Sequence, residues 1–283
     1  QLVASQRSNV PAMFSRTLLL LLSLSLPGMA TAACSRPIRV PAAISGQTVT
    51  SDGERVGGVI PDVMNKIGAA IGCTFVWTPV ARMRLEAMFQ NGTADLLIAS
   101  NQVPARDRYG YFLPVVETRA TLISVRSERA PVRSMQELAA RSELRVALVR
   151  GYDFGPAYQA LSRDLAAQGR LYLQPTPRPV ARMLAEGLAD VTIMTGIAFV
   201  GGLYGDARSE IIADKLRSEP LDDLPWMRSG IYLSKKSLSA ADRKLLEHAL
   251  NEAVRDGTWW RALQRHYAAD LLNDSTRQLP QGR

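Results

Sequence analysis

Cysteine and histidine are scarce in this chain of 283 residues, with two of each, and this scarcity excludes several kinds of site. Neither His248 nor His266 has the spacing to a cysteine that a zinc site requires. The G-x-S-x-G pattern, the phosphate-binding loop and the dinucleotide-binding glycine motif are also absent. We therefore expect no cofactor, no metal and no catalytic residues.

Acidic residues are fewer than basic ones, 26 against 34. A basic balance can indicate nucleic-acid binding, but here the basic residues are scattered into short runs such as ARMR, ARDR and SKKS. No aromatic residues alternate with them in the manner of a nucleic-acid platform. The composition therefore favours small acidic or carboxylate-bearing ligands over nucleic acid.

Long apolar runs are scarce too, and the clearest one, Leu18–Leu26, is shorter than the roughly 20 residues that span a bilayer. It follows Met13 and Arg16 and precedes a Pro-Gly pair and the small residues that end at Ala32. This order predicts a secretory signal cleaved after Ala32. An ordinary N-terminal helix is the alternative. Residues 1–12 would be an upstream translation extension or added sequence.

Apolar runs alternate with amphipathic segments along the rest of the chain, which predicts an α/β fold with parallel sheets. Strands are expected at Ile38–Ala43, Thr74–Thr78, Ala94–Ala99, Thr121–Val125, Arg145–Val149, Val191–Met194 and Gly230–Leu233. Helices are expected at Ile60–Ile71, Arg82–Asn91, Met135–Arg141, Pro156–Gln168, Val180–Glu186, Ala240–Asp256 and Thr258–Tyr267.

One arginine, Arg106, stands just beyond an expected buried strand. The preceding helix should end at Asn91-Gly92, and the strand Ala94–Ala99 is almost continuously apolar, as a strand covered on both faces is. Ligands of open α/β sheets bind at the carboxyl ends of such strands. A guanidinium group there could hold a carboxylate through two parallel hydrogen bonds.

The sequence GTADLLIA, followed by a short polar run, Arg106 and Phe112, resembles a segment of the bacterial extracellular solute-binding proteins of family 3, the amino-acid-binding type. Four other stretches resemble further motifs in the family's order, so that the likeness covers nearly all of residues 37–267. These stretches are DGERVGGVIPDVMNKIGAAIGCTFVWTPV, LRVALVRGYDF, AEGLADVTIMT and GIYLSKKSLSAADRKLLEHALNEAVRDGTWWRALQRHY.

The resemblance implies the two-lobed periplasmic binding protein fold of type II. Each lobe would be a mainly parallel sheet flanked by helices, and two crossovers would form a hinge. Lobe 1 would comprise 35–118 and 229–274, and lobe 2 would comprise 119–228. The signal region, 1–32, would precede them, and a disordered tail, 275–283, would follow.

The same resemblance implies a periplasmic monomer that captures a small carboxylate-bearing ligand and delivers it to the permease of an ABC transporter. The family position that binds the ligand carboxylate falls on Arg106, although Arg106 could instead pair with Asp107 or another acid, and Arg108 is a rival. Ser100 and Asn101 fall in the turn that precedes it, where they would either bind ligand or shape the turn.

In the second lobe, Tyr152 would stack over the ligand or be a surface aromatic, and Asp153 would contact the ligand or cap a helix. Thr195 stands where amino-acid binders keep an acid for the ligand ammonium. The ligand would therefore either use Asp153 for its ammonium or lack an α-amino group. Arg82 would reach a second anionic group or begin a solvated helix. Trp259 is expected to be a packing residue.

In the family, the strands that follow Cys34 and Cys73 are neighbours, which implies a disulfide in an exported protein. A free pair or a lipidated Cys34 are the alternatives. Other functions on this fold are a ligand-sensing module for a membrane partner and an enzyme like cyclohexadienyl dehydratase. Glu117 is the first acid to test in the enzyme.

Overall fold

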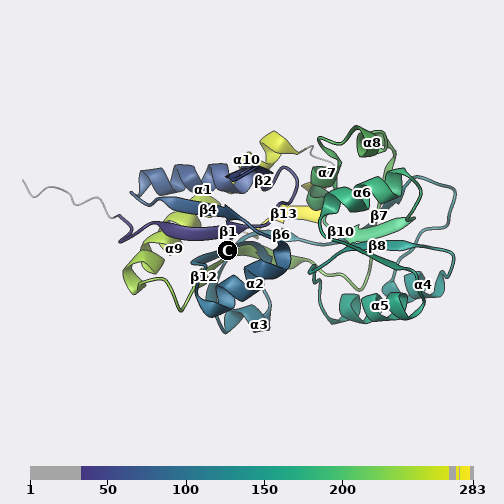
Figure 1. The fold of residues 1–283 in the computed structure, drawn as a ribbon, viewed down its shortest axis with the longest axis horizontal. Helices are drawn as coiled ribbons and strands as arrows, with labels where there is room; N and C mark the ends of the chain where they lie inside the picture. Colours follow the sequence, from purple (N-terminus) through teal and green to yellow (C-terminus); the bar gives the residue numbers. More distant parts are fainter. Residues whose placement is uncertain (1–32, 268–271, 274, 281–283) are drawn as a thin grey trace, which may run out of the picture. The chain divides into compact units, whose positions relative to one another are not determined.

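The computed structural model describes residues 33–267, 272–273 and 275–280 of the chain (Figure 1). The expected signal region lies outside the described residues. Within the described residues, no helix combines the length and the apolar character that crossing a membrane requires.

Each expected strand and helix is present within a few residues of its predicted bounds, together with others that the sequence did not predict. The strands are β1 (Ile38–Ala42), β2 (Thr50–Asp52), β3 (Arg55–Gly57), β4 (Phe75–Pro79), β5 (Leu96–Asn101), β6 (Gly110–Thr118), β7 (Thr121–Val125), β8 (Val146–Val149), β9 (Leu171–Gln174), β10 (Val191–Met194), β11 (Leu216–Pro220), β12 (Met227–Ser234) and β13 (Thr276–Gln278). The helices are α1 (Val59–Ala70), α2 (Arg82–Asn91), α3 (Pro104–Asp107), α4 (Met135–Ala140), α5 (Pro156–Ala167), α6 (Pro177–Ala185), α7 (Gly196–Leu203), α8 (Ala207–Glu210), α9 (Ala240–Arg255) and α10 (Thr258–His266), with a 3-10 helix at Ala213–Lys215.

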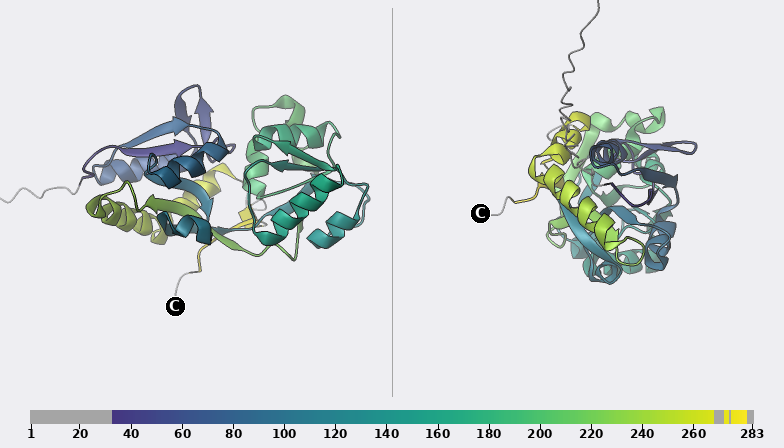
Figure 2. Two further views of the ribbon diagram at one scale, coloured as in Figure 1. Left: turned by 60° about the horizontal axis from the view of Figure 1, so that its bottom comes forward. Right: turned by 90° about the vertical axis from the view of Figure 1, so that its left-hand side faces the viewer.

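The strands form two main sheets. One has the order β11-β7-β10-β8-β9 and the other the order β13-β6-β12-β5, while β1 pairs with β4 in parallel and β2 pairs with β3. In Figure 1 the elements labelled α4 to α8 gather around the five-stranded sheet, and α1, α2, α9 and α10 gather around the four-stranded sheet and β1 with β4. Figure 2 shows the same elements in two further views. The chain passes between the sheets twice, from β6 to β7 and from β11 to β12.

The expectation that each sheet is mainly parallel is wrong for the four-stranded sheet, which is antiparallel at every pairing. The physical reason lies in the crossovers. The chain leaves this sheet along β6 and returns to it along β12, so two adjacent strands must run in opposite directions. The five-stranded sheet is mixed, with β8 parallel to β9 and β10, and β7 antiparallel to its neighbours.

The expected disordered tail is also wrong for part of its length, because Thr276–Gln278 forms β13 on the edge of β6. Its residues pair in order with Thr118, Glu117 and Val116. Ser275 and Thr276 are buried. A polar sequence can therefore be ordered here because its backbone completes the exposed edge of a strand.

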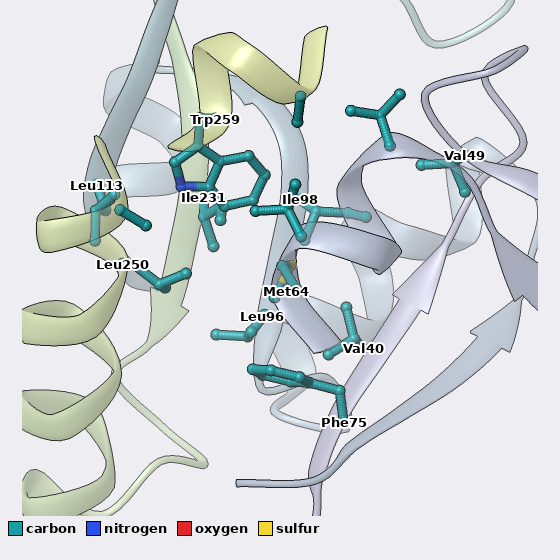
Figure 3. Packing of buried hydrophobic residues seen from close by; sticks show 14 of the residues in the cluster. Val40, Val49, Met64, Phe75, Leu96, Ile98, Leu113, Ile231, Leu250 and Trp259 are labelled. Carbon is teal, nitrogen blue, oxygen red and sulfur yellow. The ribbon is translucent and has the colours of Figure 1, made fainter. Parts of the chain in front are cut away.

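Apolar residues fill the space around both sheets. The core beside the four-stranded sheet joins β1, β4, β5 and β12 to α1, α9 and α10, and it includes Met64, Leu96, Ile231 and Trp259 (Figure 3). In the five-stranded sheet, the residues of β8 alternate between two separate cores, because successive side chains of a strand point to opposite faces.

Two aspartates, one beside each main sheet, make matching sets of hydrogen bonds. The carboxylate of Asp95 accepts hydrogen bonds from the backbone N–H of Arg39 at 2.8 Å, from its Nε at 3.1 Å and from its Nη2 at 2.9 Å. The carboxylate of Asp190 accepts the corresponding bonds from Arg145 at 2.7, 3.0 and 2.9 Å. Asp95 additionally binds the guanidinium of Arg36.

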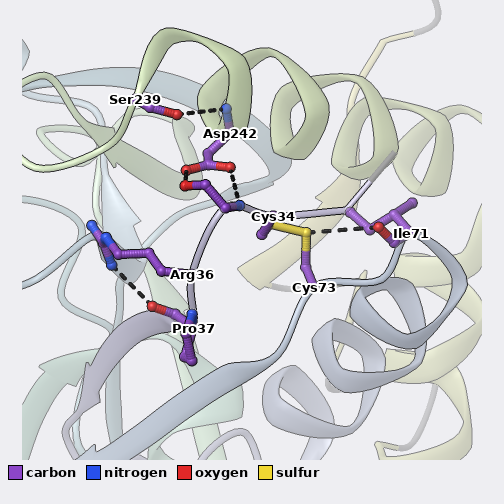
Figure 4. The surroundings of a disulfide bond; sticks show 8 residues. Cys34, Arg36, Pro37, Ile71, Cys73, Ser239 and Asp242 are labelled. Atoms are coloured by element: carbon purple, nitrogen blue, oxygen red, sulfur yellow. Dashed lines mark hydrogen bonds between the residues drawn. A yellow bond between two sulfur atoms is a disulfide. The ribbon is translucent and has the colours of Figure 1, made fainter. Parts of the chain in front are cut away.

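The expected disulfide is present between Cys34 and Cys73, whose Cα atoms are 4.9 Å apart (Figure 4). The parallel pairing of β1 with β4, which places Ile38 opposite Phe75, brings the two cysteines together. The bridge closes the chain over a sequence separation of 39 residues.

Replacing both cysteines with serine should lower the free energy of unfolding by about 3–4 kcal/mol, because the unfolded chain regains the freedom that the closed loop removes. Denaturant unfolding of the oxidised and reduced protein measures this loss. Neither cysteine lines the two cavities described below, so we expect ligand affinity to be unchanged. Equal stabilities of oxidised and reduced protein would contradict the stabilising role.

Candidate ligand-binding site

A cavity of about 160 Å³, called cavity 1 below, is lined by residues from elements around both main sheets. Its apolar wall includes Ile60, Val116, Ile197 and Trp259. An engineered apolar cavity of about 150 Å³ holds benzene. The space in cavity 1 therefore suits a small organic molecule.

Arg106 lies on the wall of cavity 1, as the sequence predicts, and its guanidinium group is held on two sides. Its Nε and Nη2 donate to the carboxylate of Glu86 on α2, with distances of 3.0 Å and 2.6 Å to Oε1. Its Nη1 donates to the carbonyl oxygen of Asn101, the last residue of β5, at 2.9 Å. Arg106 thus pairs with an acid, as one alternative from the sequence allowed, and that acid is Glu86 rather than Asp107.

Strand β5 positions Asn101 through an irregularity. Its register with β12 changes between the pairs Leu97–Tyr232 and Ser100–Gly230, so β5 contains one extra residue at this point. Ala99 has a φ of 49°, which is uncommon for a residue with a side chain. Both Ala99 and Asn101 line cavity 1.

Ser100 does not line cavity 1, which corrects the expectation that it contacts ligand. Its side chain is buried, and its hydroxyl donates to the carbonyl oxygen of Ile98 at 3.1 Å. The residues on either side of Ser100 face the cavity, and successive side chains of a strand point in opposite directions. Ser100 therefore has a structural role inside β5.

Arg82, at the start of α2, lines cavity 1 and a second cavity of about 390 Å³, called cavity 2. The two cavities share Ser45, Arg82, Ala99 and Tyr152. The guanidinium carbon of Arg82 is 5.9 Å from the centre of the Tyr152 ring. Burial raises the pKa of Tyr152, so its hydroxyl stays neutral.

Asp153 and Thr195 line cavity 1 and also hold the local backbone. Asp153 Oδ1 accepts a hydrogen bond from the backbone N–H of Gly155 at 2.9 Å, and its Oδ2 accepts one from Gln159 Nε2 at 2.8 Å. The N-cap of α5 is Gly155, so Asp153 stabilises the turn before the helix without capping it. Thr195 is the N-cap of α7 and accepts from the N–H of Ala198.

Sequence reasoning missed much of the lining of cavity 1, including Ser45 and Thr276, and it missed Glu86, the acid that pairs with Arg106. Ser45 and Thr276 come from segments without a recognisable motif, and Glu86 is separated from its partner Arg106 by 20 positions. One signal was present for Glu86, since it is the one acid in α2. Trp259 packs in the core as expected, and it lines the cavity as well.

Glu117, the acid considered for catalysis, is absent from the described lining of cavity 1. Its carboxylate accepts a hydrogen bond from Arg277 Nε at 2.7 Å, across the pairing of β6 with β13. The guanidinium carbon of Arg277 also lies 4.3 Å from the centre of the Trp226 ring. Glu117 is thus engaged in the contacts around the crossovers.

Solved structures with a similar fold are known. The complex of EhuB with hydroxyectoine has 16% sequence identity and a TM-score of 0.65, over 84% of this chain and 91% of that one. A putative L-cystine ABC transporter from Listeria monocytogenes has 18% identity and a TM-score of 0.63, over 83% and 97%. A histidine kinase sensor domain with similarity to periplasmic binding proteins has 18% identity and a TM-score of 0.61, over 81% and 95%.

At these identities the likeness establishes the fold, which is the two-lobed periplasmic binding protein fold that the sequence predicts. None of the curated proteins matches the sequence. The sequence model described as bacterial extracellular solute-binding proteins, family 3, matches residues 44–269, which is most of the chain. The chain therefore belongs to family 3 of the bacterial extracellular solute-binding proteins.

Proposed function

We propose that the protein captures a small carboxylate-bearing ligand, an amino acid or a related organic acid, in cavity 1 and delivers it to the permease of an ABC importer. The observation that carries this proposal is the presence of two guanidinium groups, from Arg82 and Arg106, on the wall of a largely apolar cavity. Such a wall excludes water from an organic body while the arginines bind its carboxylate.

The proposed lobes follow the two sheets. Lobe 1 would contain 35–118 and 229–274, extended by β13, and lobe 2 would contain 119–228. The segments between β6 and β7 and between β11 and β12 would act as the hinge. A periplasmic location after removal of residues 1–32, and a monomeric state, belong to the same proposal.

Within this site, Asn101 orients Arg106 through its carbonyl oxygen, and Tyr152 covers the ligand from the boundary of the two cavities. Asp153 is the one carboxylate among the described residues that line cavity 1. A ligand ammonium would therefore be placed at Asp153, because the Thr195 hydroxyl cannot neutralise a charge. A ligand without an ammonium group would not need Asp153 or Thr195 as a partner.

Two other functions remain consistent with the fold, namely sensing for a membrane partner and a dehydratase-like reaction. Sensing would use the same capture of ligand with a different partner protein. The enzyme would need an acid at the ligand, and Glu117 is engaged with Arg277. We therefore propose binding without catalysis.

The proposal is tested by native mass spectrometry of freshly purified protein, followed by calorimetry with amino acids and organic acids. Arg106→Ala should weaken binding of the carboxylate that the wild-type protein binds by at least about thirty-fold, because a hydrogen-bonded charge contact is worth about 2 kcal/mol or more. Arg108→Ala is the matched control, since Arg108 is exposed and does not line cavity 1.

Full affinity in Arg106→Ala would contradict its role in binding. The absence of binding by the wild-type protein to every carboxylate in the panel would contradict the proposed function itself. The unfolding temperature of each variant without ligand is measured in parallel, because loss of Arg106 leaves Glu86 without its ion-pair partner.

A further inference from the structure

The two arginines beside cavity 1 differ in their partners, because Arg106 has an ion pair in the described residues and Arg82 has none. Arg106 and Glu86 form an ion pair in which the Arg106 side chain is 12% exposed and that of Glu86 is 30% exposed, so their opposite charges largely cancel. Arg82 lines both cavities, and the described part of the chain provides its side chain with no ion pair and no hydrogen bond. Its neighbours are the ring of Tyr152, the like charge of Arg106 and the opposite charge of Glu86, which is already paired with Arg106.

The setting of Arg82 is unfavourable for a cation. A charged group that is partly removed from water needs a counterion, and Arg82 is partly buried. The one acid in α2, Glu86, stands four residues after Arg82 and is already paired with Arg106. Burial is the largest influence and lowers the pKa of Arg82. The charge of Arg106 adds to this effect, while Tyr152 and Glu86 oppose it. An anion bound beside Arg82 would relieve this cost.

Arg106 differs from Arg82, because it can donate hydrogen bonds to a ligand while its charge is largely cancelled by Glu86. Of the five N–H groups of its guanidinium, those directed at Glu86 and Asn101 use Nε, one hydrogen of Nη2 and one of Nη1. Two hydrogens remain, one on each Nη, and can be donated to a carboxylate. The charge of Glu86 repels the same carboxylate, so Arg106 contributes hydrogen bonds and direction but little net charge.

Taking the proposed capture of a carboxylate as given, we propose that Arg82 supplies the charge that binds the ligand, while Arg106 supplies the geometry. The site then takes one monoanionic carboxylate at the boundary of cavities 1 and 2. Among the described residues that line either cavity, Arg82 is the one cation without an ion pair. A second negative charge on a ligand would find no counterion, so the site selects monocarboxylates over dicarboxylates.

Lysine and glutamine variants separate charge from geometry. A calorimetric panel of mono- and dicarboxylates of three to eight carbons, amino acids included, first identifies the tightest monocarboxylate for the wild-type protein. Arg82→Lys should bind it within about three-fold of wild type, whereas Arg82→Gln should lose at least about ten-fold and most of the dependence of affinity on salt. Arg106→Lys should also lose about ten-fold, because an ammonium lacks the planar donors of a guanidinium.

Changing Glu86 tests the selectivity. In Glu86→Gln, the charge of Arg106 is no longer cancelled, so the affinity ratio of the matched dicarboxylate to the monocarboxylate should rise by about ten-fold. The double variant Glu86→Gln/Arg106→Gln keeps the net charge of the wild-type protein and leaves no unpaired acid. It should bind more weakly and keep the salt dependence that Arg82→Gln loses.

The outcomes separate this inference from the proposed function. If the wild-type protein binds no carboxylate of the panel, the proposed function is overturned and this inference with it. If Arg82→Gln keeps both affinity and salt dependence while the double variant loses them, Arg106 carries the charge and this inference alone is overturned. An unchanged ligand ratio in Glu86→Gln would overturn the selectivity for monocarboxylates. Thermal unfolding without ligand establishes that each variant is folded.

Discussion

Replacing Asp95 with asparagine is expected to lower the free energy of unfolding by about 3 kcal/mol. The Asp95 side chain is fully buried and binds the guanidinium groups of Arg36 and Arg39, which joins the start of β1 to the residue that precedes β5. Removing one partner of a buried ion pair costs about 3–5 kcal/mol. The lower end applies because the side chains of the two arginines are 37% and 44% exposed and can regain water. Denaturant unfolding without ligand measures the loss.

Asp190→Asn is the matched control for this experiment. Asp190 makes the same three hydrogen bonds to Arg145, but its side chain is 32% exposed and that of Arg145 is 42% exposed. Ion pairs in contact with solvent contribute about 0–1 kcal/mol. The loss at Asp190 should therefore be about 1 kcal/mol or less. Equal losses at Asp95 and Asp190 would contradict burial as the cause of the difference.

The dependence of the free energy of unfolding on pH, compared between wild type and Asp95→Asn, gives a second measurement. Burial alone would raise the pKa of Asp95, but the hydrogen bonds from Arg36 and Arg39 outweigh it and hold the pKa well below the ordinary 3.8. A lowered pKa in the folded state stabilises the protein fully above pH 3.8, and this contribution is lost as the pH falls from there towards the folded pKa. The stability difference between wild type and Asp95→Asn should therefore shrink below pH 3.8.

The α/β elements could be predicted from the sequence because their signals are local. Alternation of apolar runs with amphipathic segments marked the strands and helices, and Gly92 ends α2 with a left-handed φ of 82°, as its position after the last helical residue predicts. Strand direction is not a local property. A parallel and an antiparallel strand that are both covered show similar apolar runs, so the antiparallel four-stranded sheet could not be inferred from β5 alone.

The sequence predicted where Arg106 lies at the site, but it did not predict which acid pairs with Arg106. The position of Arg106 after an apolar strand placed it at the cavity, because the strand fixes where the following turn emerges. Its ion pair with Glu86 depends on how α2 packs against that turn, which no spacing rule encodes. Similarly, the extra residue in β5 decides that Asn101 lines the cavity while Ser100 is buried. Register irregularities of this kind leave no pattern in the sequence.

Gly46→Ala is expected to have the second large effect, a loss of roughly 1–3 kcal/mol in the affinity for the carboxylate that the wild-type protein binds. Gly46 lies in the turn between β1 and β2, with a φ of 56°, and a Cβ atom there would stand 2.0 Å from the Cα of Gly201 in α7. Overpacking costs about 1–3 kcal/mol. The left-handed backbone of Gly46 costs a residue with a side chain about 1–2 kcal/mol more, and this part lowers the free energy of unfolding with and without ligand. Calorimetry of wild type and variant measures the change.

The reason for expecting this loss in binding is the position of the contact. The turn of Gly46 belongs to the part of the chain around the four-stranded sheet, whereas α7 follows β10 of the five-stranded sheet. Ser45, beside Gly46, and Ile197, in the first turn of α7, both line cavity 1. If the two backbones are forced apart, the walls of the cavity separate, and every ligand should lose affinity by a similar factor.

Neighbouring glycines of α7 provide the matched comparison. Gly201→Ala introduces a residue that favours helices over glycine by about 1 kcal/mol, so any loss must come from contacts outside the helix. Its Cβ would stand 2.6 Å from the Cα of Gly46, whereas a Cβ at Gly202 would meet Pro177 of α6 at 2.8 Å. Gly201→Ala should therefore reduce affinity with a small change in unfolding temperature, and Gly202→Ala should reduce the unfolding temperature of the protein without ligand. If Gly201→Ala binds as tightly as wild type, the approach of the two backbones is not required for binding.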